Sequence, residues 1–305
     1  MSDGTPTELD QLDTEQSNER TRDIDRLDSL HILERLNDED ALVAGLVRQA
    51  LPEIARAVDL AVDVWRRGGR VVLFGAGTSG RLALLDAAEL GPTFSVPADR
   101  YLARIAGGSN AFARATEGTE DDRIAGAGAA ADLGPDDLAF GITASGRTPW
   151  VIGALAEARR LGAATVALSA VSTPRLAEHA DVSIAIVTGP EAIAGSSRLK
   201  AGTAQKLVLN GFSTALMIRL GKVYGNLMVD VQLTNEKLER RAVRLIEQIA
   251  GVDRIAAQRA MRDAGDLKTA IVALRGGVSV EVARTRLAGA GGRLRAALGE
   301  DASSP

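Results

Sequence analysis

A glycine-rich loop in the first third of the chain carries residues suited to binding phosphate. The stretch 75–80 reads GAGTSG; it follows an apolar run that includes β-branched residues and precedes an Ala/Leu-rich helical pattern. This spacing matches the G-x-G-x-x-G fingerprint of dinucleotide-binding loops, in which backbone amides at a helix N-terminus hold phosphate groups. Thr78 and Ser79 add two hydroxyl groups beside Gly80. Taken alone, the loop fits a nucleotide or another phosphate compound.

A dinucleotide needs more than this loop. The fold that binds it places an acidic residue at the end of the second strand, about 20 residues past the glycines, where the carboxylate binds the ribose. The nearest acidic residue is Asp99, which lies before the predicted strand 101–106 and therefore at its wrong end. The sequence thus favours a different phosphate ligand.

The Ser-Gly-Arg triplet of this loop occurs a second time. The stretches 74–87 (FGAGTSGRLALLDA) and 141–154 (GITASGRTPWVIGA) each place it between a buried strand and a helix. The residues of the second loop that could bind a ligand are Ser145, Gly146, Arg147 and Thr148. We expect Thr148 to be the N-cap of the next helix, because Pro149 suits the first helical position. Loops at the carboxyl ends of two parallel strands can face one crevice.

A third group of hydroxyl side chains precedes the longest predicted helix. Ser196 and Ser197 stand at its expected start and are followed by Arg198 and Lys200. Three helix starts that carry hydroxyl groups around one crevice favour a phosphate monoester joined to a polyol. A sugar phosphate is the simplest ligand of this kind.

The composition excludes several kinds of active site. The chain of 305 residues has no cysteine, so disulfides, thiolate zinc sites and cysteine nucleophiles are absent. Its two histidines are His31 and His179. Because hydrolytic triads and most zinc sites use histidine, we expect catalysis by carboxylate, hydroxyl, Lys or Arg side chains.

Charge and hydropathy limit the partners. The net charge of −4 gives no pattern typical of nucleic-acid or membrane binding. The N-terminus is acidic and polar, and no run approaches the roughly 18 apolar residues of a membrane helix. We expect a cytoplasmic protein that binds neither nucleic acid nor membrane.

The elements that position these loops alternate in type. Helical patterns follow the first, third and fourth of the predicted strands, and a long helix is predicted over 196–220. Strand and helix in alternation predict an α/β fold, in which a parallel sheet is sandwiched by helices. The predicted strands cover 70–75, 101–106, 138–143, 165–169 and 182–187.

Both ends of the chain differ from this central part. Residues 1–12 are predicted to be disordered, and a sugar-phosphate domain with N-terminal helices is predicted over 13–225. Its helices are expected at 24–36 and, after an N-cap in 37–40, at 41–65.

The C-terminal part is predicted to be wholly helical. A separate domain over 226–305 should begin with one helix over 229–251. Three short helices should follow, split by turns that contain Gly265, the pair 276–277 and the stretch 289–292.

Five segments together carry a family resemblance. They are GAGTSGRLALLDAAE, AGGSNAFARATEGTEDD, GITASGRTPWVIGALAEARRLG, GSSRLKAGTAQKLVLN and GKVYGNLMVDV. The sequence resembles the N-acetylmuramic acid 6-phosphate etherases of the sugar isomerase (SIS) superfamily from about Thr14 to its end. This resemblance implies a flavodoxin-like, three-layer SIS fold, a homodimer, no metal and no organic cofactor. It also implies cleavage of the D-lactyl ether of N-acetylmuramic acid 6-phosphate, which gives N-acetylglucosamine 6-phosphate and D-lactate.

The resemblance also points to individual carboxylates. The family's two catalytic glutamates fall on Glu89, in DAAELGPTF, and Glu120, in EGTEDD. Glu89 would donate a proton to the leaving lactate, and we infer that Glu120 removes the proton on C2. Glu191 matches a functional carboxylate of sugar-isomerase relatives; its alternative role is to cap the following segment. Thr143 departs from the family pattern, where alanine is usual.

Three alternatives to the etherase interpretation remain open. Without the resemblance, the acidic run around Glu120 indicates a solvated face or a helix start. Sugar-isomerase modules also act as phosphosugar-sensing regulators, which bind without turnover. An aldose–ketose phosphosugar isomerase would remove the C2 proton but would expel nothing from C3. We take the etherase reading because both glutamates and the SRLKAGTAQK segment are present.

Overall fold

The computed structural model describes residues 13–114, 116, 118–231 and 236–300. These residues form two compact units. The first unit contains residues 13–88 and 98–213, and the second contains residues 89–97 and 214–300. The segment 1–12, predicted to be disordered, lies outside the described residues. The predicted domain border after residue 225 stays a prediction.

The first unit is built on a five-stranded, wholly parallel sheet with strand order β2-β1-β3-β4-β5. The α/β fold with a parallel sheet is therefore confirmed, and each strand lies within two residues of its predicted ends. The strands are β1 (Val71–Gly75), β2 (Tyr101–Ile105), β3 (Leu138–Ile142), β4 (Ala164–Ser169) and β5 (Val182–Ala185).

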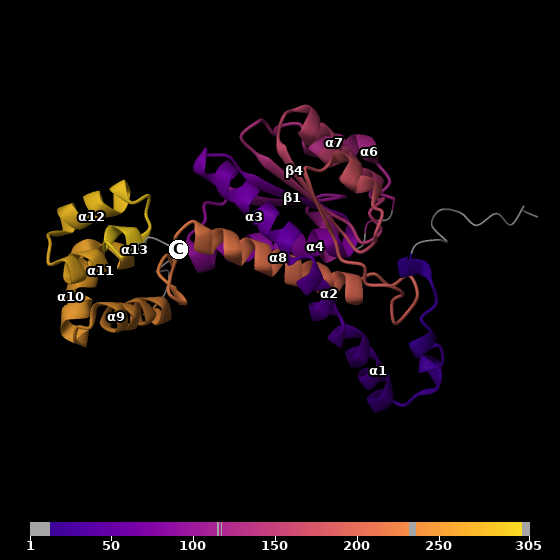
Figure 1. Cartoon of the computed structure of the whole chain (residues 1–305), viewed down its shortest axis with the longest axis horizontal. Coiled ribbons are helices and arrows are strands. Elements are labelled where there is room, and N and C mark those ends of the chain that lie inside the picture. The colour runs from indigo at the N-terminus through magenta and orange to yellow at the C-terminus, as the bar shows by residue number, and fades with distance from the viewer. Residues whose placement is uncertain (1–12, 115, 117, 232–235, 301–305) are drawn as a thin grey trace, which may run out of the picture. The chain divides into compact units, whose positions relative to one another are not determined.

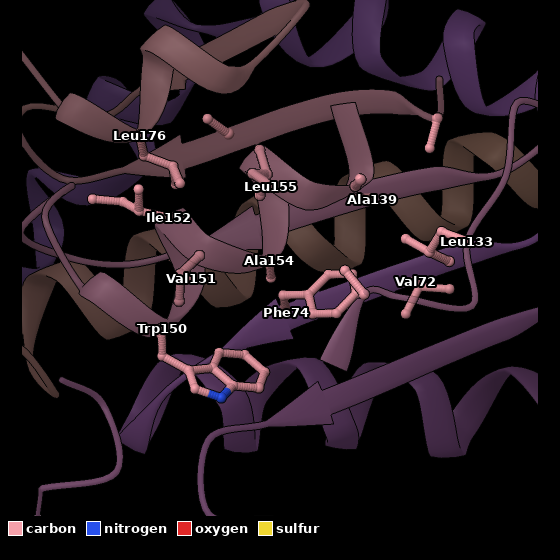
Figure 2. Packing of buried hydrophobic residues seen from close by; sticks show 14 of the residues in the cluster. Val72, Phe74, Leu133, Ala139, Trp150, Val151, Ile152, Ala154, Leu155 and Leu176 are labelled. Atoms are coloured by element: carbon pink, nitrogen blue, oxygen red, sulfur yellow. The ribbon is translucent and has the colours of Figure 1, made fainter. Parts of the chain in front are cut away.

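Both faces of the sheet are covered by helices, so β1 and β3 are buried along their whole length (Figure 1). On one face, α7 (Pro149–Arg160) packs on β1 and β3, and α6 (Arg123–Ala129) packs on α7. Trp150 of α7 lies beside Phe74 in this apolar layer, with ring centroids 6.1 Å apart (Figure 2). Because successive side chains of a strand point to opposite faces, alternate side chains of β1 pack against the helices on one face and on the other.

The opposite face is covered by α3 (Leu51–Arg66) and by the part of α8 (Lys200–Arg219) that belongs to the first unit (Figure 1). Phe140 of β3 meets Phe212 of α8 edge to face, with 5.0 Å between ring centroids. Such a pair contributes about 1 kcal/mol of stability beyond that gained by burying its apolar area. The sheet is thus the middle of three layers.

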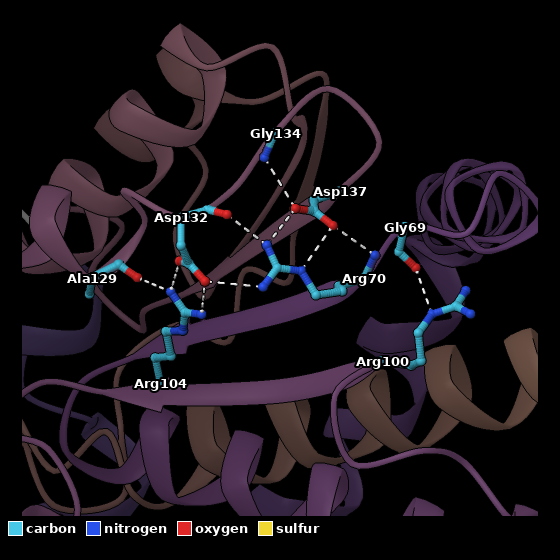
Figure 3. A network of polar contacts seen from close by, with 8 residues as sticks. All are labelled: Gly69, Arg70, Arg100, Arg104, Ala129, Asp132, Gly134 and Asp137. Carbon is cyan, nitrogen blue, oxygen red and sulfur yellow. Dashed lines mark hydrogen bonds and ion pairs between the residues drawn. The ribbon is translucent and has the colours of Figure 1, made fainter.

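Four ionised side chains close the amino-terminal edge of the sheet (Figure 3). Arg70 donates to Asp137 and Asp132, and Arg104 donates to Asp132. The hydrogen bonds from Arg104 and Arg70 hold the pKa of Asp132 well below its usual range. Every charge of this network has a partner, so it ties the loop 132–137 to β1 and β2.

Close contact between α6 and α7 depends on glycine. A Cβ atom on Gly126 would lie 1.9 Å from the Trp150 carbonyl oxygen, whereas one on Gly128 would meet nothing within 4 Å. We expect Gly126→Ala to lower the free energy of unfolding by about 1–3 kcal/mol, because the helices must move apart. The matched change Gly128→Ala should raise it by up to about 1 kcal/mol. Urea unfolding of both variants tests this contrast, and equal effects would contradict it.

The helices before the sheet differ from the prediction. In place of a helix over 24–36, the chain forms the short 3-10 helix η3 (Ile24–Arg26) and α1 (Ser29–Ala41). The segment 41–65 is divided into α2 (Val43–Gln49) and α3.

The predicted N-cap in residues 37–40 is wrong, because these residues lie inside α1, whose N-cap is Asp28. Glu39 is buried there and forms ion pairs with two residues that lie far from it in the sequence, Arg20 and Lys200. Local spacing carries no signal of such partners.

Three further corrections concern the elements around the sheet. The segment after β4 forms the short 3-10 helix η4 (Arg175–His179) in place of the predicted helix. Two unpredicted helices, α5 (Asn110–Ala113) and α6, lie between β2 and β3. The long helix α8 begins at Lys200, four residues later than predicted, because the carboxylate of Glu191 accepts its first backbone N–H groups.

The second unit contains a hairpin and a group of helices. The hairpin, which was not predicted, pairs β6 (Val223–Tyr224) with β7 (Leu227–Met228). The helix predicted over 229–251 is α9 (Glu236–Ala250); residues 232–235 lie outside the described part of the chain.

The three short helices of this unit are confirmed. Gly265 and Gly277 end two of them with positive φ angles of 76° and 57°, a conformation that glycine adopts without strain. A fourth short helix, α13 (Leu294–Ala297), was not predicted. The three predicted ones are α10 (Arg254–Ala264), α11 (Leu267–Gly276) and α12 (Val280–Gly289).

Within the described residues, no helix combines the length and apolar character needed to cross a membrane.

Candidate sugar-phosphate site

The strand order creates a crevice at the carboxyl ends of β1 and β3. These strands are neighbours, but the chain leaves β1 toward β2 and leaves β3 toward β4, on the other side of the sheet. The loops that follow the two strands therefore diverge, and ligands of open α/β sheets bind at such a point. A cavity of about 390 Å³ lies there, lined within the described residues by both Ser-Gly-Arg loops.

Glycine lets the first loop turn tightly into α4 (Gly77–Phe94). Gly77 has a φ angle of 52°. A Cβ atom on Gly80 would lie 2.5 Å from Cγ1 of Ile105 and 2.8 Å from the Gly75 carbonyl oxygen. The loop therefore keeps the start of α4 close to β1 and β2, and its N-terminal backbone N–H groups favour an anion. Thr78 and Ser79 both line the cavity, and Ser79 is buried.

The second loop contributes a linked set of hydroxyl groups. Oγ1 of Thr143 lies 2.6 Å from Oγ1 of Thr148 and 3.4 Å from Oγ of Ser145. Thr148 occupies the N-cap position before Pro149, but its hydroxyl makes no capping bond to α7; the predicted cap is in this respect wrong. Its hydroxyl pairs with Thr143, the residue that departs from the family pattern. Ser145, Arg147 and Thr148 line the cavity.

Gly146 allows the second loop to adopt its conformation and to pack closely against Pro174. Its φ angle is 68°, and a Cβ atom there would lie 2.4 Å from Cβ of Pro174. Gly80 and Gly146 thus shape the two loops and do not themselves line the cavity.

Glu120 is one of the residues that line the cavity. Its carbonyl oxygen accepts the backbone N–H of Trp150 at 2.9 Å, which fixes this part of the chain beside the first turn of α7. Asp121 also lines the cavity. Glu117, at the start of the acidic run, lies outside the described residues.

Glu89 lies in another part of the chain. It is an exposed residue of α4 and belongs to the second unit, whereas the described residues that line the cavity all belong to the first. The catalytic roles of Glu89 and Glu120 stay predictions.

Besides the two glycines, three predicted ligands lie away from the cavity. Glu191 is fully buried and accepts the backbone N–H groups of Lys200 and Ala201, each at 2.9 Å. Burial raises the pKa of Glu191, although these two hydrogen bonds act against the shift. Lys200 is 1 % exposed and donates to Oε2 of Glu39 at 2.6 Å. Because Glu191 caps α8 and Lys200 closes a buried ion pair, neither faces the cavity.

The third is Ser196, which donates its backbone N–H to Ile193 and does not line the cavity, whereas its neighbour Ser197 does. The pair Ser196–Ser197 lies in the turn before α8, not at the helix start as predicted.

Two further residues line the cavity without any signal in the local sequence, Thr14 and Glu15. Gly195 donates its backbone N–H to the Thr14 carbonyl oxygen at 3.0 Å, across 181 positions of the chain (195 − 14). Asn18 extends the attachment by donating to the Pro190 carbonyl oxygen. Such long-range contacts are invisible to local patterns, and a polar N-terminal segment reads as disordered.

The described residues contain no cluster of three or more His, Cys, Asp or Glu side chains able to hold a metal ion.

Comparisons with known proteins connect this chain to a family. The model of the glucokinase regulatory protein N-terminal SIS domain matches residues 53–159, and that of the SIS domain matches residues 116–215. A phosphoheptose isomerase from Francisella tularensis has a similar fold, with a TM-score of 0.52 and 21% identity over 63% of this chain and all of that one.

Much closer relatives cover nearly the whole chain. N-acetylmuramic acid 6-phosphate etherase of Mesorhizobium japonicum is 49% identical over 97% of this chain and 98% of its own length. The enzyme of the same name from Brucella anthropi is 51% identical over 96% of both chains. This chain therefore belongs to the N-acetylmuramic acid 6-phosphate etherases, a family of enzymes that contain the SIS domain.

Proposed function

We propose that the cavity binds N-acetylmuramic acid 6-phosphate and that the enzyme cleaves its D-lactyl ether during the breakdown of cell-wall amino sugars. The observation that carries this proposal is the meeting of two hydroxyl-rich loops and the Glu120 carboxylate around one cavity. The lining therefore contains groups suited to binding a phosphate, to binding a polyol and to removing a proton from a carbon atom.

The phosphate group would bind between the two Ser-Gly-Arg loops. The N-terminus of α4 favours an anion through its unpaired backbone N–H groups. Ser79 and Ser145 approach the cavity from β1 and β3, with Thr78, Thr148 and Ser197 around them. Arg147 adds a positive charge to the second loop.

The proposed reaction is an elimination followed by the addition of water. In the ring-opened sugar, the C1 aldehyde acidifies the proton on C2. Glu120 takes this proton, and the bond between C3 and the ether oxygen breaks. The oxygen takes a proton and leaves as D-lactate; the family resemblance, not the lining of the cavity, assigns this proton to Glu89. Water then adds to C3 of the unsaturated sugar, and a proton returns to C2. General acid and base groups typically contribute 10²- to 10⁴-fold each to such steps.

A phosphosugar-sensing regulator is the second candidate. The match to the glucokinase regulatory protein domain favours it. Such a protein would bind the sugar phosphate at the same loops without releasing lactate. The presence of both glutamates supports the etherase.

The proposed phosphate site is tested by Ser79→Ala and Ser145→Ala. We expect each change to weaken the binding of N-acetylglucosamine 6-phosphate about tenfold, because a hydrogen bond to a charged group is lost. Binding of the unphosphorylated sugar should stay within about twofold. Isothermal titration calorimetry measures both, and equal losses for the two sugars would contradict phosphate binding at these residues.

The assembly is proposed to be a homodimer, as the family resemblance implies. Leu30 and Leu33 of α1 are each 62 % exposed, and residues three positions apart lie on the same face of a helix. This apolar face supports association with a second copy. The cytoplasmic location stays a prediction.

A further inference from the structure

A second, smaller cavity adjoins the sugar-phosphate cavity. Its volume is about 170 Å³, less than half the 390 Å³ of its neighbour. Ala76, Gly77 and Glu120 line both cavities, so the two meet at these residues. The smaller one has room for a substituent of the sugar. We refer to it as the side pocket.

The side pocket contains a positive charge that the proposed function has not used. Arg81 lines it and lies two positions after Ser79 on α4. Side chains two positions apart on a helix point in different directions, which agrees with Ser79 lining the larger cavity and Arg81 the side pocket.

One hydrogen bond orients this side chain. Nε of Arg81 donates to the Phe112 carbonyl oxygen at 3.0 Å. Within the described residues this is the one hydrogen bond of its guanidinium, which leaves the two terminal nitrogens to bind a ligand. A guanidinium held in this way is suited to a planar carboxylate, which it can bind through two parallel hydrogen bonds.

The remaining walls complement a short, partly apolar acid. Ala106 and Ala111 offer methyl groups, and Thr119 offers a hydroxyl-bearing side chain. The lactyl group has one methyl group, one carboxylate and the ether oxygen. Its carboxylate must enter a site that already contains the Glu120 carboxylate, and a cation is needed to offset that repulsion.

We propose that Arg81 binds the carboxylate of the D-lactyl group in the side pocket and so selects the ether substrate over other sugar phosphates. This inference rests on the proposed function. With the phosphate between the loops and the lactyl group in the side pocket, the bond that breaks lies where the two cavities meet, at Glu120.

The test compares ligands with and without the lactyl group. We expect Arg81→Gln to raise KM for N-acetylmuramic acid 6-phosphate about 10- to 100-fold, because a charge-assisted hydrogen-bonded pair is lost. The inhibition constant of N-acetylglucosamine 6-phosphate, which lacks the lactyl group, should change less than threefold. This second measurement also shows that the variant is folded.

Two further comparisons isolate the charge. The wild type should prefer the natural substrate to its lactyl carboxamide analogue, and Arg81→Gln should lose that preference. Arg81→Lys should retain part of it, because lysine keeps the charge without the two-pronged geometry. Arg160→Gln, which alters an exposed arginine paired with Glu157, is the matched control and should leave every value unchanged.

The outcomes separate this inference from the proposed function. If the wild type releases no lactate, both fail. If the wild type is active and Arg81→Gln keeps its KM and its preference, the inference alone is wrong. Equal losses of binding for both sugar phosphates would also overturn it, since Arg81 would then bind the phosphate or support the loop.

Discussion

Glu120→Gln is expected to cause the largest loss of D-lactate release from N-acetylmuramic acid 6-phosphate. The amide cannot accept the C2 proton, so the rate should fall by about 10²- to 10⁴-fold, the usual contribution of a general base. Exchange of the C2 proton of N-acetylglucosamine 6-phosphate with solvent deuterium should stop as well. A coupled lactate assay and proton NMR measure the two losses.

Glu89→Gln provides the contrast that separates the two roles. Without a proton donor, lactate should leave slowly, while deuterium exchange at C2 continues because Glu120 is intact. Glu157→Gln, a change at a carboxylate that pairs with exposed Arg160 on α7, is the control and should leave both rates unchanged. Continued exchange in Glu120→Gln would show that another group removes the C2 proton.

The second large effect concerns stability. Glu39→Gln should lower the free energy of unfolding at pH 7 by about 3–5 kcal/mol, because the Lys200 ammonium stays buried without a counter-charge. Lys200 and Glu39 have side chains that are 1 % and 3 % exposed. Replacing both partners, as in Glu39→Gln combined with Lys200→Met, should recover much of the loss. Urea unfolding of the two variants and the wild type gives the comparison.

The pH dependence of this loss follows from the carboxyl group. Burial by itself would raise the pKa of Glu39, but hydrogen bonds from Arg20, Lys200 and Asn18 outweigh it and bring the pKa to about 2. A lowered pKa stabilises the fold above the unfolded value of about 4.3, and this contribution disappears as the pH falls toward 2. The difference between wild type and Glu39→Gln should therefore shrink between about pH 4.3 and 2. A difference that stays constant over this interval would contradict the role of the ionised pair.

This ion pair also connects stability to the site. Asn18 donates to Glu39 at 2.8 Å, and Thr21 donates to the Ala192 carbonyl oxygen at 2.7 Å. These bonds hold the N-terminal segment that brings Thr14 and Glu15 to the cavity. Loss of Glu39 is thus expected to weaken sugar-phosphate binding as well as the fold.

The features that the sequence predicted well are local in origin. Buried strands such as β1 are runs of apolar residues, and the turn into α4 requires glycine at residue 77, where φ is positive. The Ser-Gly-Arg repeat identified both walls of the cavity because each copy follows a parallel strand at the same edge of the sheet.

Features that depend on distant partners were missed. The hydroxyl-bearing neighbours of Lys200 in the sequence favour a ligand role for it, but its ammonium pairs with Glu39, 161 positions away. Glu191 accepts a hydrogen bond from the backbone N–H of Lys200 at the start of α8. Arg81 lines a pocket to which the segment after β2 also contributes. Spacing along one element cannot reveal which distant segment folds against it.

The most direct test of the central claim is the release of D-lactate from N-acetylmuramic acid 6-phosphate by the purified full chain. We expect D-lactate and N-acetylglucosamine 6-phosphate to form in equal amounts, with no lactate from the unphosphorylated sugar. If calorimetry shows that the sugar phosphate binds and no lactate forms, the chain is a phosphosugar sensor and the etherase account is wrong.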